Sequence, residues 1–173
     1  GKTYVYLRSI LELNKEYGFT KFIIVVPTVA IRTGVEKSIK MLKEHFKILY
    51  GIDVEKHSFV YDSKNIKSIS TKLVESTDLS ICIMNIQAFN KDSNKIRQED
   101  EYGQIIWRDI QMIRPIVIID EPQKIEGDGK KKSQSLKAIE ELEPLFTLRY
   151  SATHKKLYNQ IYKLDSFDAF EKD

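Results

Sequence analysis

Four short segments of this chain consist mainly of branched and aromatic apolar residues, and they constrain its fold more than any other feature. Such segments suit strands of a sheet that is covered on both faces, as parallel sheets are. Stretches with helical periodicity separate them along the chain. This alternation predicts an α/β fold, a mostly parallel sheet with helices on both faces. The predicted buried strands are Phe22–Val26, Leu79–Met84, Pro115–Ile119 and Leu145–Tyr150.

The stretches between these strands supply the predicted helices. Thr3–Tyr17 has an apolar face and ends at Gly18, and apolar residues recur at helical spacing from Val35 to Phe46. A chain of 173 residues can bury one sizeable core, so we expect a single domain over residues 1–173. The remaining predicted elements are a short strand at Ser58–Tyr61 and helices at Ile66–Ser76, Trp107–Ile113 and Ser135–Leu142.

Composition excludes several classes of protein. The chain is 42% hydrophobic and 31% charged, which is typical of a globular protein, and its net charge of +3 permits a polyanionic partner without requiring one. The single cysteine, Cys82, lies in an apolar strand, so we expect a small buried side chain and no disulfide within the chain. No apolar run approaches the ~20 residues of a membrane span. We therefore expect a cytoplasmic protein without a membrane partner.

Two polar motifs stand where a parallel sheet binds ligands. Gly1-Lys2-Thr3 runs directly into the first predicted helix, the place where a P-loop holds phosphates with its backbone N–H groups and its lysine. Asp120 and Glu121 follow the apolar run Ile116–Ile119, which is the form of a Walker B segment. Each motif alone has a simpler interpretation, an accidental tripeptide or a strand that ends in surface acids. Their order favours a nucleotide site, because parallel strands end at a common edge.

Two further motifs close the first and the last predicted strands. Val25–Thr28 and Tyr150–Thr153 are, taken singly, an ordinary turn and an ordinary helix cap. In order, however, Gly-Lys-Thr, Pro-Thr, Asp-Glu and Ser-Ala-Thr resemble motifs I, Ia, II and III of superfamily 2 helicases and translocases. Within that superfamily, Asn85–Asn90, Asp120–Gln123 and Ser151–His154 are similar to segments of the restriction (Res) subunit of type III restriction–modification enzymes.

The resemblance implies a role for each residue of the nucleotide site. Lys2 would contact the β- and γ-phosphates of ATP, and Thr3 and Asp120 would hold Mg²⁺. Glu121 would be the base that activates water, and Gln123 would sense the γ-phosphate. The implied fold is a RecA-like P-loop NTPase domain. Because the first glycines of the P-loop do not precede Gly1, we expect a domain that is truncated within that loop.

The resemblance also implies contacts with double-stranded DNA. Pro27-Thr28 and the segment Asn85–Asn90, which are similar to motifs Ia and Ib, would touch the phosphate backbone of one strand. Motif III would relay the state of the nucleotide to those contacts. For Arg32 a solvated helix charge is the simpler interpretation, as it is for the lysine run Lys130–Lys132. His154 could couple nucleotide to DNA or cap local backbone. The residues expected in these roles are Pro27, Thr28, Arg32, Gln87, Asn90, Ser151, Thr153 and His154.

The resemblance covers essentially the whole chain and identifies it as the first RecA-like domain of a larger protein. In such a protein a second RecA-like domain, which brings arginine fingers, and a nuclease domain would follow, and a methyltransferase (modification) subunit would be the partner. The parent would be an ATPase and endodeoxyribonuclease, and its motor would move on DNA before cleavage. The isolated fragment would be inactive.

Two other functions remain open on the sequence alone. The first is another superfamily 2 motor, such as a repair helicase or a type I restriction translocase, from which Pro122-Gln123 after the two acids points away. The second is a nucleic-acid-binding domain of the same fold that does not hydrolyse ATP. The presence of Lys2, Thr3, Asp120 and Glu121 argues against that second function.

Overall fold

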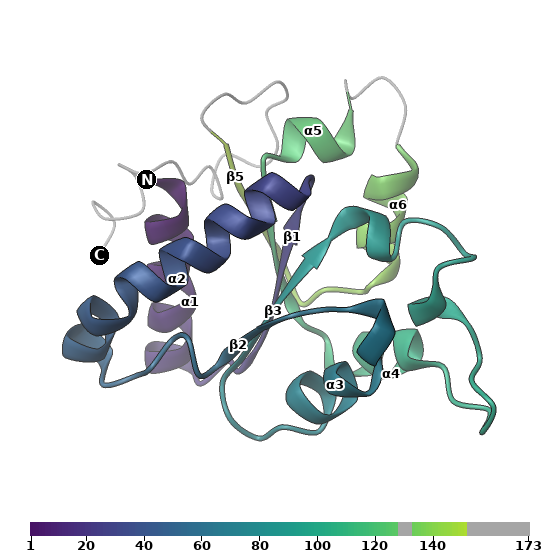
Figure 1. The fold of residues 1–173 in the computed structure, drawn as a ribbon, viewed down its shortest axis with the longest axis horizontal. Helices are drawn as coiled ribbons and strands as arrows, with labels where there is room; N and C mark the ends of the chain where they lie inside the picture. Colours follow the sequence, from purple (N-terminus) through teal and green to yellow (C-terminus); the bar gives the residue numbers. More distant parts are fainter. Residues whose placement is uncertain (128–132, 152–173) are drawn as a thin grey trace.

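A computed structural model describes residues 1–127 and 133–151, and its centre is a five-stranded, entirely parallel sheet. The strand order is β2-β3-β1-β4-β5, so the central strand, β1, lies between β3 and β4 (Figure 1). This arrangement confirms the predicted α/β class. The strands are β1 (Lys21–Val26), β2 (Ser58–Val60), β3 (Ser80–Asn85), β4 (Ile116–Asp120) and β5 (Thr147–Tyr150).

Helices cover both faces of the sheet and enclose two separate cores (Figure 1). Helices α1 (Lys2–Tyr17) and α2 (Val29–Tyr50) pack on one face. On the other face lie α4 (Ile106–Ile113), α6 (Gln134–Glu141) and the irregular segment around residues 66–74. Successive side chains of a strand point to opposite faces, so β1 sends Ile24 into the first core and Ile23 into the second.

Strand burial explains why the apolar runs predicted the sheet correctly. Every residue of β4 is buried, and β1 and β3 each have a single half-buried end residue. A one-residue shift separates prediction from structure for β3 and β4, each of which begins and ends one residue later than predicted. The predicted small buried Cys82 is confirmed, because its side chain is 0% exposed in the centre of β3.

The predicted helix Ile66–Ser76 is wrong as a regular helix. The chain there forms one turn of α3 (Lys67–Ile69) and then a π-helical turn (Ser70–Val74). Side chains from the sheet donate hydrogen bonds to backbone carbonyl groups of this segment. Nζ of Lys21 donates to the carbonyls of Leu73 and Ser76, and the Ser80 hydroxyl donates to that of Lys72 at 2.5 Å. These partners substitute for the hydrogen bonds that a regular helix would make.

A short helix that was not predicted, α5 (Pro122–Glu126), follows β4 immediately. Pro122 occupies its first turn, where proline is favoured, and Gly127 follows its last residue. Figure 1 shows α5 above the carboxyl ends of the strands. Within the described residues, no helix is long and apolar enough to cross a membrane.

Candidate functional site

The carboxyl edge of the sheet brings together residues that are far apart in the sequence. Helix α1 begins at Lys2, and β4 ends at Asp120 on the same edge (Figure 1). Nζ of Lys2 lies 2.9 Å from Oδ1 of Asp120 and hydrogen-bonds to Oε1 of Glu121. The Gly-Lys-Thr motif and the acidic pair therefore meet, as the strand order predicted.

Three ionisable side chains, one lysine and two acids, lie in contact at this point. Burial alone would lower the pKa of Lys2, but hydrogen bonds and charge from Asp120 and Glu121 outweigh it and raise that pKa above its usual value. Burial alone would raise the pKa of Glu121, and the hydrogen bond and charge of Lys2 lower it below its usual value. Lys2 is thus held as a cation and Glu121 as an anion.

Asp120 is a buried carboxylate with a partner at each oxygen. Its residue is 2% exposed, and Oδ2 accepts a hydrogen bond of 3.1 Å from the phenol of Tyr6 in α1. Oδ1 is also buried, and its partner among the described residues is Nζ of Lys2, at 2.9 Å. Burial, and the charge of Asp120, raise the pKa of Tyr6 well above its usual value, whereas a hydrogen bond with Thr3 lowers it. Thr3 therefore lies in the same cluster.

The residues after Asp120 form a chain of contacts toward β5. Glu121 has φ 53° and ψ 60°, a left-handed conformation that is unusual for a glutamate and turns the chain sharply from β4 into α5. Its Oε2 accepts a hydrogen bond from Nε2 of Gln123, and Oε1 of Gln123 accepts one of 2.8 Å from the Ser151 hydroxyl. The proximity of Glu121 and Ser151 that the motifs predicted is thus mediated by Gln123.

The side chains at this edge can be compared with the ligands that a divalent cation requires. No group of three or more His, Cys, Asp or Glu side chains that could hold a metal occurs in residues 1–127 and 133–151. Mg²⁺ in phosphate-binding sites, however, needs only one or two protein carboxylates, because phosphate oxygens and water complete its shell. The buried carboxylate of Asp120, which has the Lys2 ammonium beside Oδ1, is a ligand of this kind, and Thr3 hydrogen-bonds with Tyr6, which donates to the same carboxylate. The residues present fit such an ion.

The residues expected to contact DNA form a second group at this edge. Thr28 caps α2 by accepting a hydrogen bond of 3.2 Å from the N–H of Ile31. Gln87 donates to the carbonyl of Pro27 at 3.0 Å, and Arg32 donates to Asn85 at 3.0 Å. The structure thus brings motif Ia and the segment after β3 together.

Asn90 lies apart from those contacts and bonds to the Ser135 hydroxyl in α6 at 3.3 Å. Three other predicted elements, Thr153, His154 and the run 130–132, lie outside the described residues. Trp107, in the first turn of α4, packs against the segment that follows β3. It is buried, its ring lies 5.6 Å from that of Phe89, and the Arg97 guanidinium stacks 4.5 Å above it.

Sequence reasoning missed two sets of residues that organise the site. Tyr6 was not singled out, although its place one turn after Thr3 in an amphipathic helix was a signal that it faces the sheet. The second set is a pair of charges: Glu126, buried in α5, accepts a hydrogen bond of 2.9 Å from Nε of Arg149 in β5. No pattern in the sequence indicates that pair, because 23 residues separate its members.

Comparisons with known proteins agree with this geometry. The family model described as "Type III restriction enzyme, res subunit" matches residues 1–156. Over its whole length the chain is 31% identical to the type III restriction–modification enzyme EcoPI Res subunit of Escherichia phage P1, and 32% identical to the EcoP15I Res subunit of Escherichia coli. Over 88% of its length it is 32% identical to the StyLTI Res subunit of Salmonella typhimurium.

The aligned region covers 19% of the EcoPI and EcoP15I subunits and 17% of the StyLTI subunit, so the chain spans about a fifth of the relatives it matches. The match contains both the Gly-Lys-Thr motif and the acidic pair that Lys2 joins in the structure. The parallel sheet with helices on both faces is the RecA-like arrangement that the sequence predicted. The chain belongs to the family of type III restriction enzyme Res subunits.

Proposed function

We propose that this chain is part of an ATP-driven motor that moves on DNA in a type III restriction enzyme. The observation that carries the proposal is the position of Lys2, at the start of α1, in contact with both acids at the end of β4. A lysine at a helix N-terminus beside two carboxylates at a strand end is the arrangement that P-loop enzymes use to hold nucleotide and metal. Membership of the Res family supports the same function.

Each residue at the edge has a role in this proposal. Lys2 binds the β- and γ-phosphates of ATP, together with the backbone N–H groups of the first turn of α1, and Asp120 and Thr3 hold Mg²⁺. The metal ion, when bound, neutralises phosphate charge and orients the phosphates. Glu121 orients the attacking water and accepts its proton. Gln123 contacts both Glu121 and Ser151, so it can report the γ-phosphate to β5.

The DNA-binding part of the proposal rests on the second group of residues. The N-terminus of α2, capped by Thr28, and the Arg32 side chain lie beside the segment that follows β3. Backbone N–H groups and arginine are the usual partners of DNA phosphates. In the complete protein we infer a second RecA-like domain with an arginine finger, a nuclease domain, and a modification subunit as partner.

The test measures DNA-stimulated ATP hydrolysis by the full-length subunit in complex with its modification subunit. Glu121→Gln is the decisive variant, because it keeps the shape of the side chain and removes the base. We expect turnover to fall by a factor on the order of 10²–10⁴, the usual contribution of a general base, with ATP binding retained. Residues 1–173 alone should show no DNA-stimulated hydrolysis, because an arginine finger contributes about 10³–10⁵ in rate.

Glu16→Gln, at an exposed position near the end of α1, is the matched control and should leave turnover unchanged. Lys2→Ala should also abolish hydrolysis, but it removes the cation beside the buried Asp120 and therefore costs stability as well. A Glu121→Gln complex that folds normally and hydrolyses ATP at the wild-type rate would refute the role of Glu121. A wild-type complex without ATPase activity on its DNA would refute the proposed function.

A further inference from the structure

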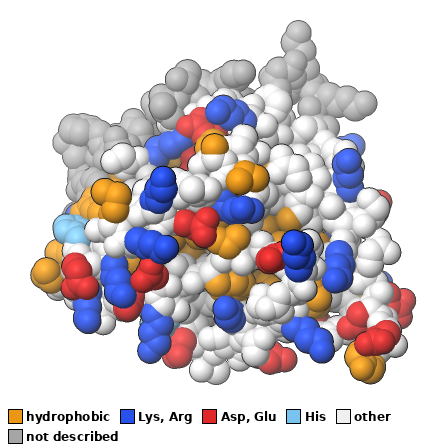
Figure 2. Space-filling view, in the orientation of Figure 1, with side chains coloured by type: hydrophobic (Ala, Val, Ile, Leu, Met, Phe, Trp, Pro, Cys, Tyr) orange, Lys and Arg blue, Asp and Glu red, His pale blue; other side chains and the backbone are white. Residues whose placement is uncertain are grey.

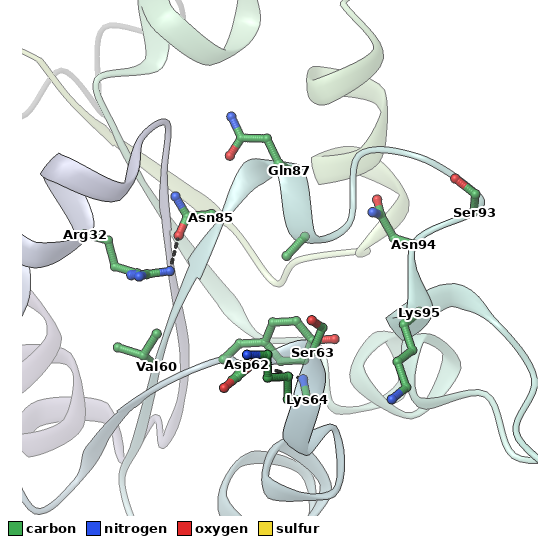
Figure 3. A pocket seen from close by; sticks show the side chains of 12 residues that line it. Arg32, Val60, Asp62, Ser63, Lys64, Asn85, Gln87, Ser93, Asn94 and Lys95 are labelled. Atoms are coloured by element: carbon green, nitrogen blue, oxygen red, sulfur yellow. Dashed lines mark hydrogen bonds between the residues drawn. The ribbon is translucent and has the colours of Figure 1, made fainter.

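A polar pocket opens beside the group of residues that we propose to contact DNA. Its volume is about 580 Å³, within the range of sites that bind small molecules or parts of larger ones. Figure 3 shows Arg32 and Asn85 on one side of it, Lys95 on the other, and Lys64 between them on the segment after β2. The pocket therefore extends from motif Ia, across the ends of β3 and β2, to residues that no motif includes.

The charge of the pocket is predominantly positive. Its lining contains three cations, Arg32, Lys64 and Lys95, and one acid, Asp62. The Asp62 carboxylate already accepts a hydrogen bond of 2.9 Å from the N–H of Lys64, as the cap of a 3₁₀ turn. Lys64 and Lys95 are exposed, and within the described part of the chain neither forms an ion pair. Two ammonium groups thus remain available to an anion.

Arg32 places a fixed cation on one wall of the pocket. Its Nη1 donates to Asn85 at 3.0 Å, and its Nε forms an ion pair of 4.0 Å with Glu36, one turn further along α2. Nε itself is buried, so a ligand in the pocket would be attracted by the charge of the guanidinium and would not bind at Nε. A guanidinium that is held in place in this way suits an anionic, oxygen-rich ligand.

The lining also indicates which part of a nucleic acid would enter. Amide and hydroxyl side chains, among them Asn94 and Ser93, accompany the cations. The one aromatic residue in the lining, Tyr61, is only 7% exposed and offers no face for a base to stack on. Donors and cations without a stacking surface suit the sugar–phosphate backbone rather than the bases.

We propose that the DNA backbone continues from Arg32 through this pocket, where Lys64 and Lys95 each neutralise one phosphate. The inference rests on the proposed function and extends its DNA contact beyond the motifs. Because the contacts are to phosphates, they contribute equally on every DNA sequence. Figure 2 shows basic and acidic side chains interspersed over this face, so a broad basic surface does not explain DNA binding there, and a local site is required.

The experiment measures binding of fluorescent DNA by the full-length subunit with its modification subunit, at several salt concentrations. Each phosphate contact adds about 0.7–0.9 to the slope of log K against log salt. The double variant Lys64→Ala/Lys95→Ala should therefore bind less tightly, on all sequences alike, with a slope smaller by about 1.4–1.8. The matched control is Lys15→Ala/Lys47→Ala, which removes the same charge from exposed positions near the carboxyl ends of α1 and α2, at the opposite edge. That variant should keep the wild-type slope.

Arg32→Ala distinguishes failure of this inference from failure of the proposed function. If Arg32→Ala weakens DNA binding and the double variant leaves affinity and slope unchanged, the path stops at motif Ia and the inference is wrong. If the double variant keeps the wild-type slope for DNA but binds inorganic phosphate less tightly than the wild type does, the pocket is a site for free anions, and the inference is again wrong. Loss of DNA-stimulated hydrolysis is a separate readout, and its absence in the wild type would refute the proposed function itself.

Discussion

Replacing Tyr6 with phenylalanine would test the architecture of the site with the loss of a single oxygen atom. The Tyr6 side chain is 0% exposed, and its phenol donates to Oδ2 of Asp120 over 3.1 Å. Burial raises the pKa of this phenol well above its usual value, so it stays protonated and remains a donor at neutral pH. Tyr6→Phe leaves the packing of the ring unchanged and leaves a buried carboxylate oxygen without its donor.

The structure offers a matched control in Tyr150, whose ring lies 5.5 Å from that of Tyr6. Tyr150 is also buried, and its phenol donates to the hydroxyl of Ser9 at 3.0 Å, a neutral acceptor. A hydrogen bond to a charged group contributes about 1.5–3 kcal/mol and a neutral one about 0.5–1.5 kcal/mol. Tyr6→Phe should therefore cost about 1 kcal/mol more than Tyr150→Phe. For a chain of this size that difference lowers Tm by roughly 2–4 °C.

Urea unfolding of the 173-residue chain, followed by circular dichroism, measures both free energies of unfolding. Equal losses for Tyr6→Phe and Tyr150→Phe would refute the reasoning, because the bond to Asp120 would then be no stronger than a neutral one. In the full-length complex, Tyr6→Phe should also raise the Mg²⁺ concentration needed for half-maximal ATP hydrolysis, because Asp120 is no longer held in place. Tyr150→Phe should leave that concentration unchanged.

Three other predictions follow from single contacts. The pKa of Glu121 in the folded protein lies below its usual 4.5. The stabilising contact with Lys2 is therefore fully present above pH 4.5 and is lost as the pH falls through the folded pKa. When unfolding is measured at decreasing pH, Glu121→Gln should lose less free energy of unfolding than the wild type does. The thiol of Cys82 is 0% exposed, and burial raises its pKa, so a thiol reagent should react only at the rate of unfolding and much faster in urea. Arg97→Lys keeps the charge and loses the planar group that stacks on Trp107. The fluorescence of this single tryptophan should shift, and the free energy of unfolding should fall by about 0.5–1 kcal/mol. A variant with unchanged fluorescence would contradict the stacking.

The sheet could be predicted from the sequence because its central strands are too apolar to have a face exposed to solvent. A run such as Ile116–Ile119 is apolar on both sides and must lie between two layers of helices. The meeting of Lys2 with Asp120 could be predicted too, because parallel order places helix starts and strand ends at one edge. Both inferences use constraints that act over the whole fold.

What the sequence could not supply depends on contacts between distant side chains. The irregular turn at Ser70–Val74 exists because Lys21 and Ser80 reach its carbonyls from the sheet, and local periodicity cannot reveal such partners. The pairing of Arg149 with Glu126 is of the same kind. Helix α5, by contrast, carried a local signal in Pro122, which was taken only as part of a motif.

The contacts of Lys2 set a condition on how the proposed site works. Lys2 neutralises Asp120 and Glu121, and phosphates that engage Lys2 must replace at least one of these carboxylates as its partner. If Asp120, buried at 2% exposure, is the partner that is replaced, a buried carboxylate loses the cation beside it, which is costly in a low-dielectric site unless a divalent ion takes the place of Lys2. Nucleotide and Mg²⁺ should therefore bind with positive coupling, each raising the affinity for the other. If Glu121 is the partner that is replaced, its bond to Gln123, which in turn bonds to Ser151 after β5, would carry the exchange to that strand. We therefore expect the ion pair at the start of α1 to couple occupancy of the proposed phosphate site to the strand from which motif III begins.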